Sequence, residues 1–372
     1  MIKILNVAGA RPNFVKIAPV VAELKKHPQF FAVTLVHTGQ HYDGAMSDSF
    51  FRDLGIPEPD VHLNVGSGSH AVQTAEIMKR FEPVLIEHRP DYVLVVGDVN
   101  STVACALTAA KLGAAVIHVE AGLRSFDRTM PEEINRVLTD HLSDLLFVTE
   151  ESGRQNLIRE GIAAAKVHFV GNVMIDSLKR QIVHLGDMRT LEEHGLTPRQ
   201  YGLVTLHRPS NVDIPETLDG ILRAISTIAG RIPLLFPVHP RTRTKIVEWG
   251  MAGYFATEAG GEKKRGLHET PPLGYRDFLE LMRKARIVLT DSGGIQEETT
   301  VLSVPCLTLR HNTERPSTIE AGTNRLVGTD PAVITAEAER ILDAEMPQAV
   351  LPPLWDGKAA ERIANILLSI DR

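Results

Sequence analysis

Small residues follow a short apolar run in residues 289–298, LTDSGGIQEE. This order predicts a strand, a tight turn at residues 292–294 and the start of a helix. The first backbone N–H groups of a helix have no partner within it, and glycines let an anion approach them, so the segment indicates a phosphate site. The two glutamates that end it are expected in the first helical turn, where Glu298 can accept hydrogen bonds from ribose hydroxyl groups. The alternative is an ordinary junction capped by Asp291 or Ser292.

Two cations follow the first apolar run of the chain, in residues 9–16, GARPNFVK. Pro12 suits the first position of a helix, which puts Arg11 and Lys16 near the carboxyl end of the preceding strand. Cations at that place can bind a diphosphate. The segment has neither the Gly-x-Gly-x-x-Gly spacing of a dinucleotide site nor the Gly-Lys-Ser/Thr of a P-loop. Exposed surface cations are the alternative interpretation.

Carboxylates stand at the ends of two further apolar runs and at the start of a helix. Asp98 and Glu120 each end a run, and Glu132 lies in residues 130–136, MPEEINR, where a helix is expected to begin. The carboxyl ends of parallel strands share one edge of a sheet, so these groups can converge there. Carboxylates in such a place can act as general acid and general base. For any one of them, a helix cap or an ion pair is the alternative.

Two histidines occupy equivalent places in the second half of the chain. His207 follows the apolar run 201–205, and His239 follows the run 234–238. Both are therefore expected at ligand-facing strand ends, whereas a lone histidine is more often structural. Their spacing does not suggest a zinc site, and we predict neither a metal nor a cofactor.

Composition excludes several classes of protein. The chain has 372 residues, of which 43% are hydrophobic and 23% charged, with a formal net charge of −6. These values are typical of a globular protein of two domains. Nucleic-acid binders usually carry a basic stripe, and the densest basic cluster, residues 263–265, is short and follows a glycine pair. We therefore expect no nucleic-acid partner.

Two cysteines, Cys105 and Cys306, each lie in an apolar run. Without a Cys-x-x-Cys spacing they predict buried reduced thiols rather than a disulfide framework or a zinc site. The N-terminal residues read as a core strand rather than a signal peptide, and no run approaches the length of a membrane span. We expect a soluble cytoplasmic protein that does not engage a membrane.

Strands and helices alternate along the chain, which predicts parallel sheets with helices on both faces. The pattern changes near Gly171, and a polar region at 185–199 precedes its return. The stretch 258–270, rich in Gly, Lys and Glu, is expected to be an exposed loop. Strands are expected at 2–8, 32–37, 92–96, 115–119, 145–148, 168–170, 201–205, 234–238, 287–290 and 305–309, and helices from Pro12, over 105–112, from Asp176 and over 358–370.

These elements predict an α/β fold of two Rossmann-like, doubly wound parallel-sheet domains that face a central cleft. The first domain is expected to comprise residues 1–172, and the second residues 173–356. Ligands of open α/β sheets bind beyond the carboxyl ends of the strands, so the cleft is the expected site.

Together the motifs resemble one family. GARPNFVK, VVGDVNST, HVEAGLRS, MPEEINR, LHRPSN, LTDSGGIQEE and TERPSTIEAGTNRLVG occur in the family's order over nearly the whole chain. The chain is similar to the non-hydrolysing UDP-N-acetylglucosamine 2-epimerases, whose fold is glycosyltransferase-B-like (GT-B-like). The resemblance implies a homodimer, and a last helix, residues 357–372, that packs back on the first domain. It also implies a role in cell-envelope polysaccharide biosynthesis.

By motif position, the resemblance implies a UDP-sugar ligand and an acid–base group. Phe278 is implied to lie near the uracil, and Arg315 to hold phosphate or sugar. UDP is implied to contact Arg11, His207, Ser292, Gly293, Gly294 and Glu298, with Lys16 and His239 as further candidates. The acid–base group is Asp98, Glu120 and Glu132, with His207 beside them.

The chain departs from the family pattern in three places. Residues 209–211, PSN, replace a Glu-Asn pattern, and residues 42–44, YDG, replace Arg or polar residues of some members. Residues 66–70, GSGSH, lack the Gly-Gln of members that bind a second, activating UDP-N-acetylglucosamine. Substrate activation and the identity of the sugar therefore stay open.

Inverting C2 of such a sugar requires a route to a stable C2 anion equivalent. No nicotinamide fingerprint is present for oxidation at C3, so expulsion of UDP is the other route. Loss of UDP and the C2 proton gives 2-acetamidoglucal, to which UDP adds back after the proton returns on the opposite face. Donors preorganised around the diphosphate contribute roughly 3–4 kcal/mol each, and proton-transfer groups about 10²–10⁴-fold.

Other functions remain open at this stage. A hydrolysing relative would release UDP and free N-acetylmannosamine from the same site. A related substrate, a UDP-diacetamido uronic acid, is a further alternative. A GT-B-like glycosyltransferase would need an acceptor groove, and a sugar-nucleotide sensor would have no use for Asp98, Glu120 and Glu132.

Overall fold

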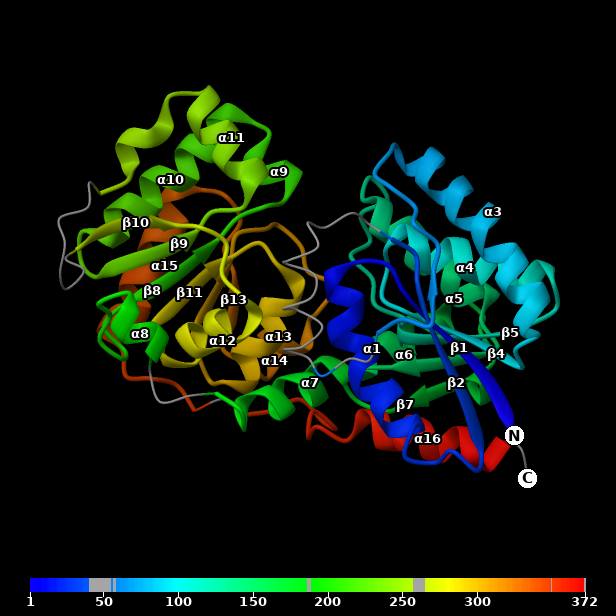
Figure 1. Cartoon of the computed structure of the whole chain (residues 1–372). Helices are drawn as coiled ribbons and strands as arrows, with labels where there is room; N and C mark the ends of the chain where they lie inside the picture. The colour runs from blue at the N-terminus through cyan, green and yellow to red at the C-terminus, as the bar shows by residue number, and fades with distance from the viewer. Residues whose placement is uncertain (40–54, 56–57, 186–188, 257–264, 349, 371–372) are drawn as a thin grey trace. The chain divides into compact units, whose positions relative to one another are not determined.

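A computed structural model describes the chain except for residues 40–54, 56–57, 186–188, 257–264, 349 and 371–372 (Figure 1). Residues 42–44 and the first two residues of the basic cluster 263–265 therefore lie outside the described part. The chain divides into two compact units, Met1–Arg180 with Pro353–Arg372, and Gln181–Pro352. The domain boundaries expected from the sequence stay predictions, and each unit is described by itself.

The first unit is built on a seven-stranded sheet in the order β3-β2-β1-β4-β5-β6-β7, and all its strand pairs are parallel. Order reverses beside β1, so right-handed crossovers send α1 and α4 to opposite faces. The strands are β1 (Ile2–Ala8), β2 (Phe31–His37), β3 (Val61–His62), β4 (Tyr92–Val96), β5 (Ala115–Ala121), β6 (Leu145–Val148) and β7 (Val167–Phe169).

Helices cover both faces of this sheet. α3 packs on α4 and α4 on α5, whereas α1 packs on α16 (Figure 1). The helices are α1 (Arg11–Leu24), α3 (His70–His88), α4 (Asn100–Lys111), α5 (Pro131–Leu142), α6 (Glu151–Arg159), η1 (Ala164–Lys166), α7 (Val173–Ile182) and α16 (Ala359–Ile370).

The second unit contains a six-stranded sheet in the order β10-β9-β8-β11-β12-β13, again with only parallel pairs. Its strands are β8 (Gly202–Thr205), β9 (Pro233–Pro237), β10 (Gly266–Thr270), β11 (Ile287–Thr290), β12 (Cys306–Thr308) and β13 (Asn324–Leu326). Its helices are α8 (Arg189–Glu193), α9 (Pro209–Val212), α10 (Pro215–Ala229), α11 (Pro240–Glu248), η2 (Met251–Tyr254), α12 (Tyr275–Lys284), α13 (Gly293–Val301), α14 (Ser317–Glu320) and α15 (Pro331–Asp343).

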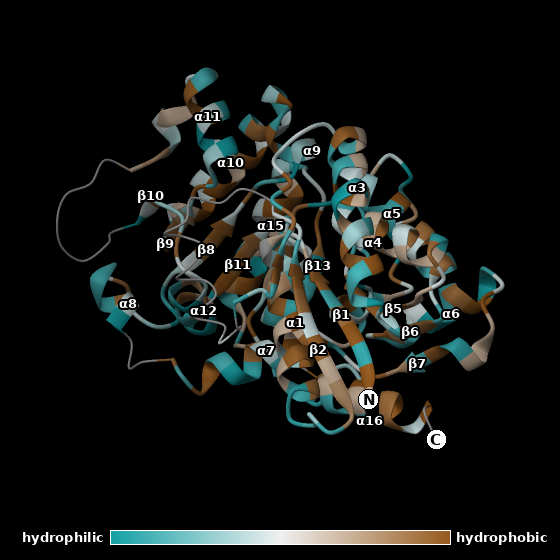
Figure 2. Ribbon diagram, turned by 45° about the vertical axis from the view of Figure 1, so that its right-hand side comes forward, coloured by the Kyte–Doolittle hydropathy of each residue, from teal (hydrophilic) through white to brown (hydrophobic). Residues whose placement is uncertain are grey.

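Continuous apolar runs explain why the central strands are buried on both faces. Strands β8 and β11 are coloured largely brown in Figure 2, whereas the short helix α8 is largely teal. Every residue of β11 is buried. Burial of apolar surface stabilises the folded state by about 25 cal/mol for each Å² that is removed from water. These strands therefore form the core, and the polar turns are positioned around it.

The expected fold class is confirmed, since both units are parallel α/β sheets. The loop expected over 258–270 is wrong in its second half, because Gly266–Thr270 forms strand β10 beside β9. Its sequence, GLHET, is too polar to signal a strand, yet pairing with β9 buries Leu267 and Thr270. The short strands β3 and β13 were likewise not expected, since two and three residues carry no readable period.

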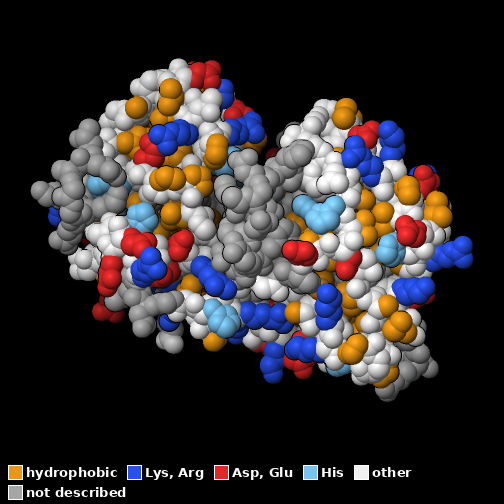
Figure 3. All heavy atoms as spheres, in the orientation of Figure 1, with side chains coloured by type: hydrophobic (Ala, Val, Ile, Leu, Met, Phe, Trp, Pro, Cys, Tyr) orange, Lys and Arg blue, Asp and Glu red, His pale blue; other side chains and the backbone are white. Residues whose placement is uncertain are grey.

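The surface charges and the two cysteines agree with what the composition predicted. On the face drawn in Figure 3, Lys and Arg side chains lie among Asp and Glu side chains. Cys105 and Cys306 are both free and buried, and burial raises the pKa of Cys306 to about 12. Within the described ranges, no helix is both long and apolar enough to cross a membrane.

Candidate functional site

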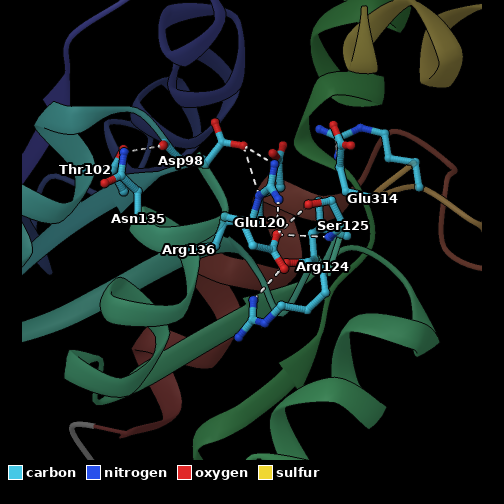
Figure 4. A network of polar contacts seen from close by, with 12 residues as sticks. Asp98, Thr102, Glu120, Arg124, Ser125, Asn135, Arg136 and Glu314 are labelled. Carbon is cyan, nitrogen blue, oxygen red and sulfur yellow. Dashed lines mark hydrogen bonds and ion pairs between the residues drawn. The ribbon is translucent and has the colours of Figure 1, made fainter. Parts of the chain in front are cut away.

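Asp98 lies in the turn after β4 and is held by Arg136 from the second turn of α5. The Nε and Nη2 atoms of Arg136 both donate to Oδ2 of Asp98, at 3.0 and 2.7 Å (Figure 4). The Asp98 side chain keeps 21% of its surface exposed, whereas that of Arg136 keeps 3%. Asn135 adds a bond from its side-chain amide to the backbone carbonyl of Asp98. Arg136 and Asn135 thus hold Asp98 in place, while part of its side chain stays accessible to solvent.

Glu133 links the same arginine to the loop after β5. Nη1 of Arg136 donates to Glu133 Oε2 at 2.5 Å. The glutamate also accepts from the backbone N–H groups of Ser125 and Phe126, each at 2.9 Å. Phe126 has φ 59°, a conformation that a bulky residue adopts only when its surroundings hold it. Arg136 and Glu133 therefore brace the Asp98 turn and this loop together.

Glu120 occupies an irregular position near the end of β5. The register with β6 shifts between Val119 and Ala121, and Glu120 has φ 73°. Such left-handed backbone at a non-glycine residue costs about 1–3 kcal/mol and is found at functional sites. Its Oε1 lies 2.7 Å from Nζ of Lys16, in an ion pair whose side chains are 2% and 8% exposed. The cation expected to bind diphosphate thus contacts one of the expected acid–base groups.

A buried charged cluster lies beneath these two turns. His118 contacts the Gly97 carbonyl through Nε2 at 2.9 Å and Asp140 through Nδ1 at 2.7 Å. Both partners only accept, so both contacts are hydrogen bonds only when each ring nitrogen carries a proton. Asp140 also accepts from Gly122 N and pairs with Arg124 at 2.7 Å. Burial opposes ionisation of Asp140, but His118 and Arg124 outweigh it and lower its pKa.

Glu132 is half-buried in the first turn of α5, where the positive end of the helix dipole favours a carboxylate. Asp98 thus follows β4, Glu120 lies near the end of β5, and Glu132 lies in the first turn of α5, all in the first unit. Their convergence on one substrate stays a prediction. Arg11 begins α1, and its side chain lies outside the described part of the chain.

In the second unit, the buried carboxylate of Asp291 contacts His207. Its carboxylate accepts from the backbone N–H groups of His207 and Arg208 and from the Asn211 amide. Oδ1 also lies 2.9 Å from Nδ1 of His207, whose side chain is 44% exposed while that of Asp291 is fully buried. Burial opposes ionisation of Asp291, but the bonds from His207 and Arg208 N–H outweigh it and lower its pKa.

His239 lies beside His207, with ring centroids 6.3 Å apart. Its Nδ1 accepts from the N–H of Arg241 and so caps α11. Partial burial first, and then His207, lower the pKa of His239, which keeps the ring neutral at pH 7. The two histidines expected at equivalent strand ends are therefore neighbours, one on a buried carboxylate and one on a helix N-terminus.

A helix, α13, follows the turn after β11, as the sequence predicted, and it begins at Gly293. The alternative of a side-chain cap is wrong: Ser292 is the N-cap but its side chain makes no capping bond, and Asp291 is used by residues 207, 208 and 211. A Cβ at Gly293 would lie 2.8 Å from Glu314 Oε1, so a larger residue there would displace that carboxylate. The first N–H groups of α13 are thus not capped by the side chain of Ser292.

The glutamates of α13 lie in its second turn rather than its first, which corrects the expectation, because the helix begins at the first glycine. Tyr275 donates to Glu298 Oε1 at 2.7 Å. Burial raises the pKa of Glu298 to about 7, against the opposing effect of that hydrogen bond. The carboxyl group therefore titrates near neutral pH.

Arg315 lies against Glu297, with Nε 2.9 Å from Oε1, and both side chains are almost fully buried. Arg310 and Glu314 form a second buried pair at 2.9 Å. Phe278 is half-buried on α12. Arg315 stands beside the glycine turn, since a Cβ on Gly293 would lie 3.6 Å from its Nε, and it is held there by Glu297.

Sequence reasoning missed the residues that support the expected ones. Arg136 and Glu133 were inside the quoted MPEEINR motif, and their spacing of three residues on a helix could have signalled the i,i+3 pair that they form. Asp291 was read only as a cap. His118, Asp140 and Tyr275 gave no signal, because their partners lie far away in sequence. Among the described residues, no three or more His, Cys, Asp or Glu side chains gather as a metal site would require.

Comparisons with known proteins agree with this architecture. A family model described as UDP-N-acetylglucosamine 2-epimerase matches residues 22–368. A UDP-N-acetylglucosamine 2-epimerase of Methanococcus maripaludis is 41% identical over 99% of this chain and 98% of its own. A UDP-2,3-diacetamido-2,3-dideoxy-D-glucuronate 2-epimerase of Pseudomonas aeruginosa is 39% identical over 99% of this chain and all of its own.

Among solved structures, the UDP-GlcNAc 2-epimerase of Methanocaldococcus jannaschii in complex with UDP-GlcNAc and UDP has a TM-score of 0.89 and 40% identity. The match covers 99% of this chain and 100% of that one. These matches, with two parallel sheets and carboxylates at adjacent strand ends, lead to one assignment. The chain belongs to the UDP-N-acetylglucosamine 2-epimerase family and is an isomerase.

Proposed function

We propose that this protein reversibly epimerises UDP-N-acetylglucosamine at C2 to UDP-N-acetylmannosamine, by eliminating UDP to 2-acetamidoglucal and adding it back. The observation that carries the proposal is the pair of cation-held carboxylates after adjacent strands, Asp98 after β4 and Glu120 at the end of β5. A transferase leaves the C2 hydrogen in place and needs a base only for its acceptor hydroxyl, whereas a C2 epimerase needs groups that remove and return the C2 proton.

The second unit carries the groups suited to a departing diphosphate. His207 is exposed above Asp291, and α13 begins at a glycine turn without a side-chain cap. Donors fixed before the reaction stabilise developing negative charge by roughly 3–4 kcal/mol each. The proposed UDP ligands of this unit are His207, His239, Phe278, Ser292, Gly293, Gly294, Glu298 and Arg315, and Arg11 is the proposed UDP ligand of the first unit.

In the first unit, we propose that Asp98, Glu120 and Glu132 exchange the C2 proton. Inversion requires that the proton leaves one face of the ring and returns on the other, so at least two groups take part. Each proton-transfer group contributes about 10²–10⁴-fold. A glycal reacts with water only if water reaches it, and exclusion of water favours return of UDP over release of free sugar.

The test is NMR of the purified protein with UDP-N-acetylglucosamine in deuterated water. The proposal expects UDP-N-acetylmannosamine that carries deuterium at C2. Product with protium at C2, or free N-acetylmannosamine as the only product, contradicts it. A Glu120→Gln variant should lose the exchange while an exposed variant, Glu151→Gln, keeps it, because Glu151 only pairs with Arg154 on the surface.

A second substrate has specific support in the Pseudomonas aeruginosa relative, which acts on a UDP-diacetamido glucuronate and is nearly as similar as the relative that acts on UDP-N-acetylglucosamine. The same NMR assay with both substrates, each at equal concentration, separates the two. The larger kcat/KM identifies the sugar for which the site is built.

Cytoplasmic location, a homodimer and a role in cell-envelope polysaccharide biosynthesis belong to the same proposal. Two reduced thiols support a reducing compartment, and the family resemblance supports the other two. Light scattering measures the mass of the purified protein in solution. For a dimer we expect twice the chain mass of 40.9 kDa.

A further inference from the structure

Lys16 projects from α1 toward the two turns that carry Asp98 and Glu120. Its ammonium lies 2.7 Å from Glu120 Oε1, and a Cβ placed on Gly97 would lie 2.9 Å from the same nitrogen. Gly97 has φ 66°, a backbone conformation that favours glycine, and a side chain there would push the ammonium away. The ammonium is therefore enclosed between the turn after β4 and the irregular end of β5.

We propose that Lys16 is a positioning residue for Glu120, holding that carboxylate ionised and oriented, and that it acts on the reaction through Glu120 rather than by binding the diphosphate. The inference rests on the proposed function and deepens it. It replaces the role that the sequence suggested for Lys16 with one that the contact to Glu120 supports.

Burial is the first argument. A buried carboxylate is strongly disfavoured in its charged form unless a cation and hydrogen bonds compensate it. The side chains of Lys16 and Glu120 are 8% and 2% exposed, so solvent contributes little to either charge. Each group therefore compensates part of the buried charge of the other, and removal of Lys16 leaves Glu120 without this partner.

Backbone geometry is the second argument. Glu120 has φ 73° at the register shift of β5, a conformation that persists only where surrounding contacts hold it. The contact to Lys16 ties this residue to α1. Asn13, one turn before Lys16, ties the same helix to β4 through a bond to the Val96 carbonyl at 2.7 Å. The Lys16 ammonium is thus fixed relative to both strands.

An ionised, fixed carboxylate is suited to accept a proton rather than to donate one. We therefore assign Glu120 as the base that accepts the C2 proton. This applies to the direction of reaction in which the Glu120 carboxylate starts ionised. The proton moves from C2 to Glu120 as the C2 electron pair forms the C1–C2 double bond and the C1–O bond to UDP breaks. Other charged or titratable groups on the surrounding elements are Asp98, His118, Arg124, Glu132, Glu133, Arg136, Asp140 and Glu150.

Replacement of Lys16 by methionine keeps length and removes the charge, which gives the first test. We expect kcat to fall at least tenfold with KM little changed, because Glu120 loses the contact that orients it. UDP affinity, measured by calorimetry, should stay within twofold of wild type. An unchanged kcat together with tenfold weaker UDP binding overturns the proposal.

Loss of one partner of a buried pair can unfold a protein, so a second comparison removes both charges. Glu120→Gln is compared with the double variant Lys16→Met/Glu120→Gln. Equal UDP affinity in the two supports action through Glu120, and weaker binding in the double variant alone overturns it. Failure of the proposed function would appear separately, as a wild-type protein that makes no C2-deuterated product, while these binding measurements still decide the role of Lys16.

Discussion

Asp291 supports His207 from beneath, with its Oδ1 2.9 Å from the imidazole Nδ1 and a further bond from the His207 backbone N–H. The carboxylate is fully buried, and the imidazole above it is 44% exposed. A bond at Nδ1 fixes which way the ring faces, so the other nitrogen lies on the side of the ring away from Asp291. The relationship explains how an exposed histidine can have a defined orientation.

The Asp291→Asn variant tests this support. Its side chain keeps the shape of aspartate but loses the charge and one acceptor, so His207 loses its orientation. We expect kcat/KM to fall about 10²-fold, the effect of removing one preorganised donor. Steady-state kinetics measures it. Asp213→Asn is the matched control, since Asp213 pairs with Arg241 at the surface of the same unit, and an equal loss in both variants would contradict the prediction.

Glu298 predicts a pH dependence of stability. Its pKa rises from 4.5 to about 7 on folding because of burial. A raised pKa means that the folded state binds the proton more tightly, so its contribution to stability is complete below pH 4.5 and is lost as pH rises through about 7. The span corresponds to roughly 3 kcal/mol.

Urea unfolding at a series of pH values measures this effect as a difference between wild type and Glu298→Gln. Between pH 4.5 and 7 the wild type should lose stability relative to the variant. The variant has no carboxyl group at this position and serves as the reference for all other titrating groups. Parallel curves for the two proteins would show that Glu298 does not titrate in this range.

Substitution of Arg136 is expected to lower both stability and activity. The Arg136→Met variant leaves the buried Glu133 and the partly buried Asp98 without their shared cation. Breaking one partner of a buried pair costs about 3–5 kcal/mol. Thermal unfolding and kcat measure the two effects. Arg154→Met removes an exposed pair with Glu151 and should cost less than about 1 kcal/mol.

Two glycines with nearly the same backbone separate crowding from strain. Gly122 has φ 79° and a Cβ there would lie 2.3 Å from the Gly153 carbonyl oxygen, whereas Gly113 has φ 77° and open space around it. Gly113→Ala should cost about 1 kcal/mol from backbone strain alone. Gly122→Ala should cost clearly more, as measured by urea unfolding, and equal costs would refute the crowding.

Much of the fold could be predicted from the sequence. Strands β1, β4, β6 and β11 have the expected bounds, because each is a largely apolar run followed by a polar or glycine turn. Polar strands such as β10 could not be found, since their burial comes from neighbours in the sheet rather than from their own residues. Helix bounds could be predicted less closely, because the neighbours of a helix in the fold also decide where it begins and ends.

For the site, the sequence by itself determined which residues end the strands: Asp98, Glu120, His207 and the turn before α13. Tertiary structure alone decided their partners, since the contacts of Lys16 with Glu120 and of Asp291 with His207 join residues 104 and 84 positions apart. Local patterns report spacing along one element, whereas ion pairs and pKa values depend on which elements the fold brings together. That is why a cation expected to bind phosphate could be found instead against a carboxylate.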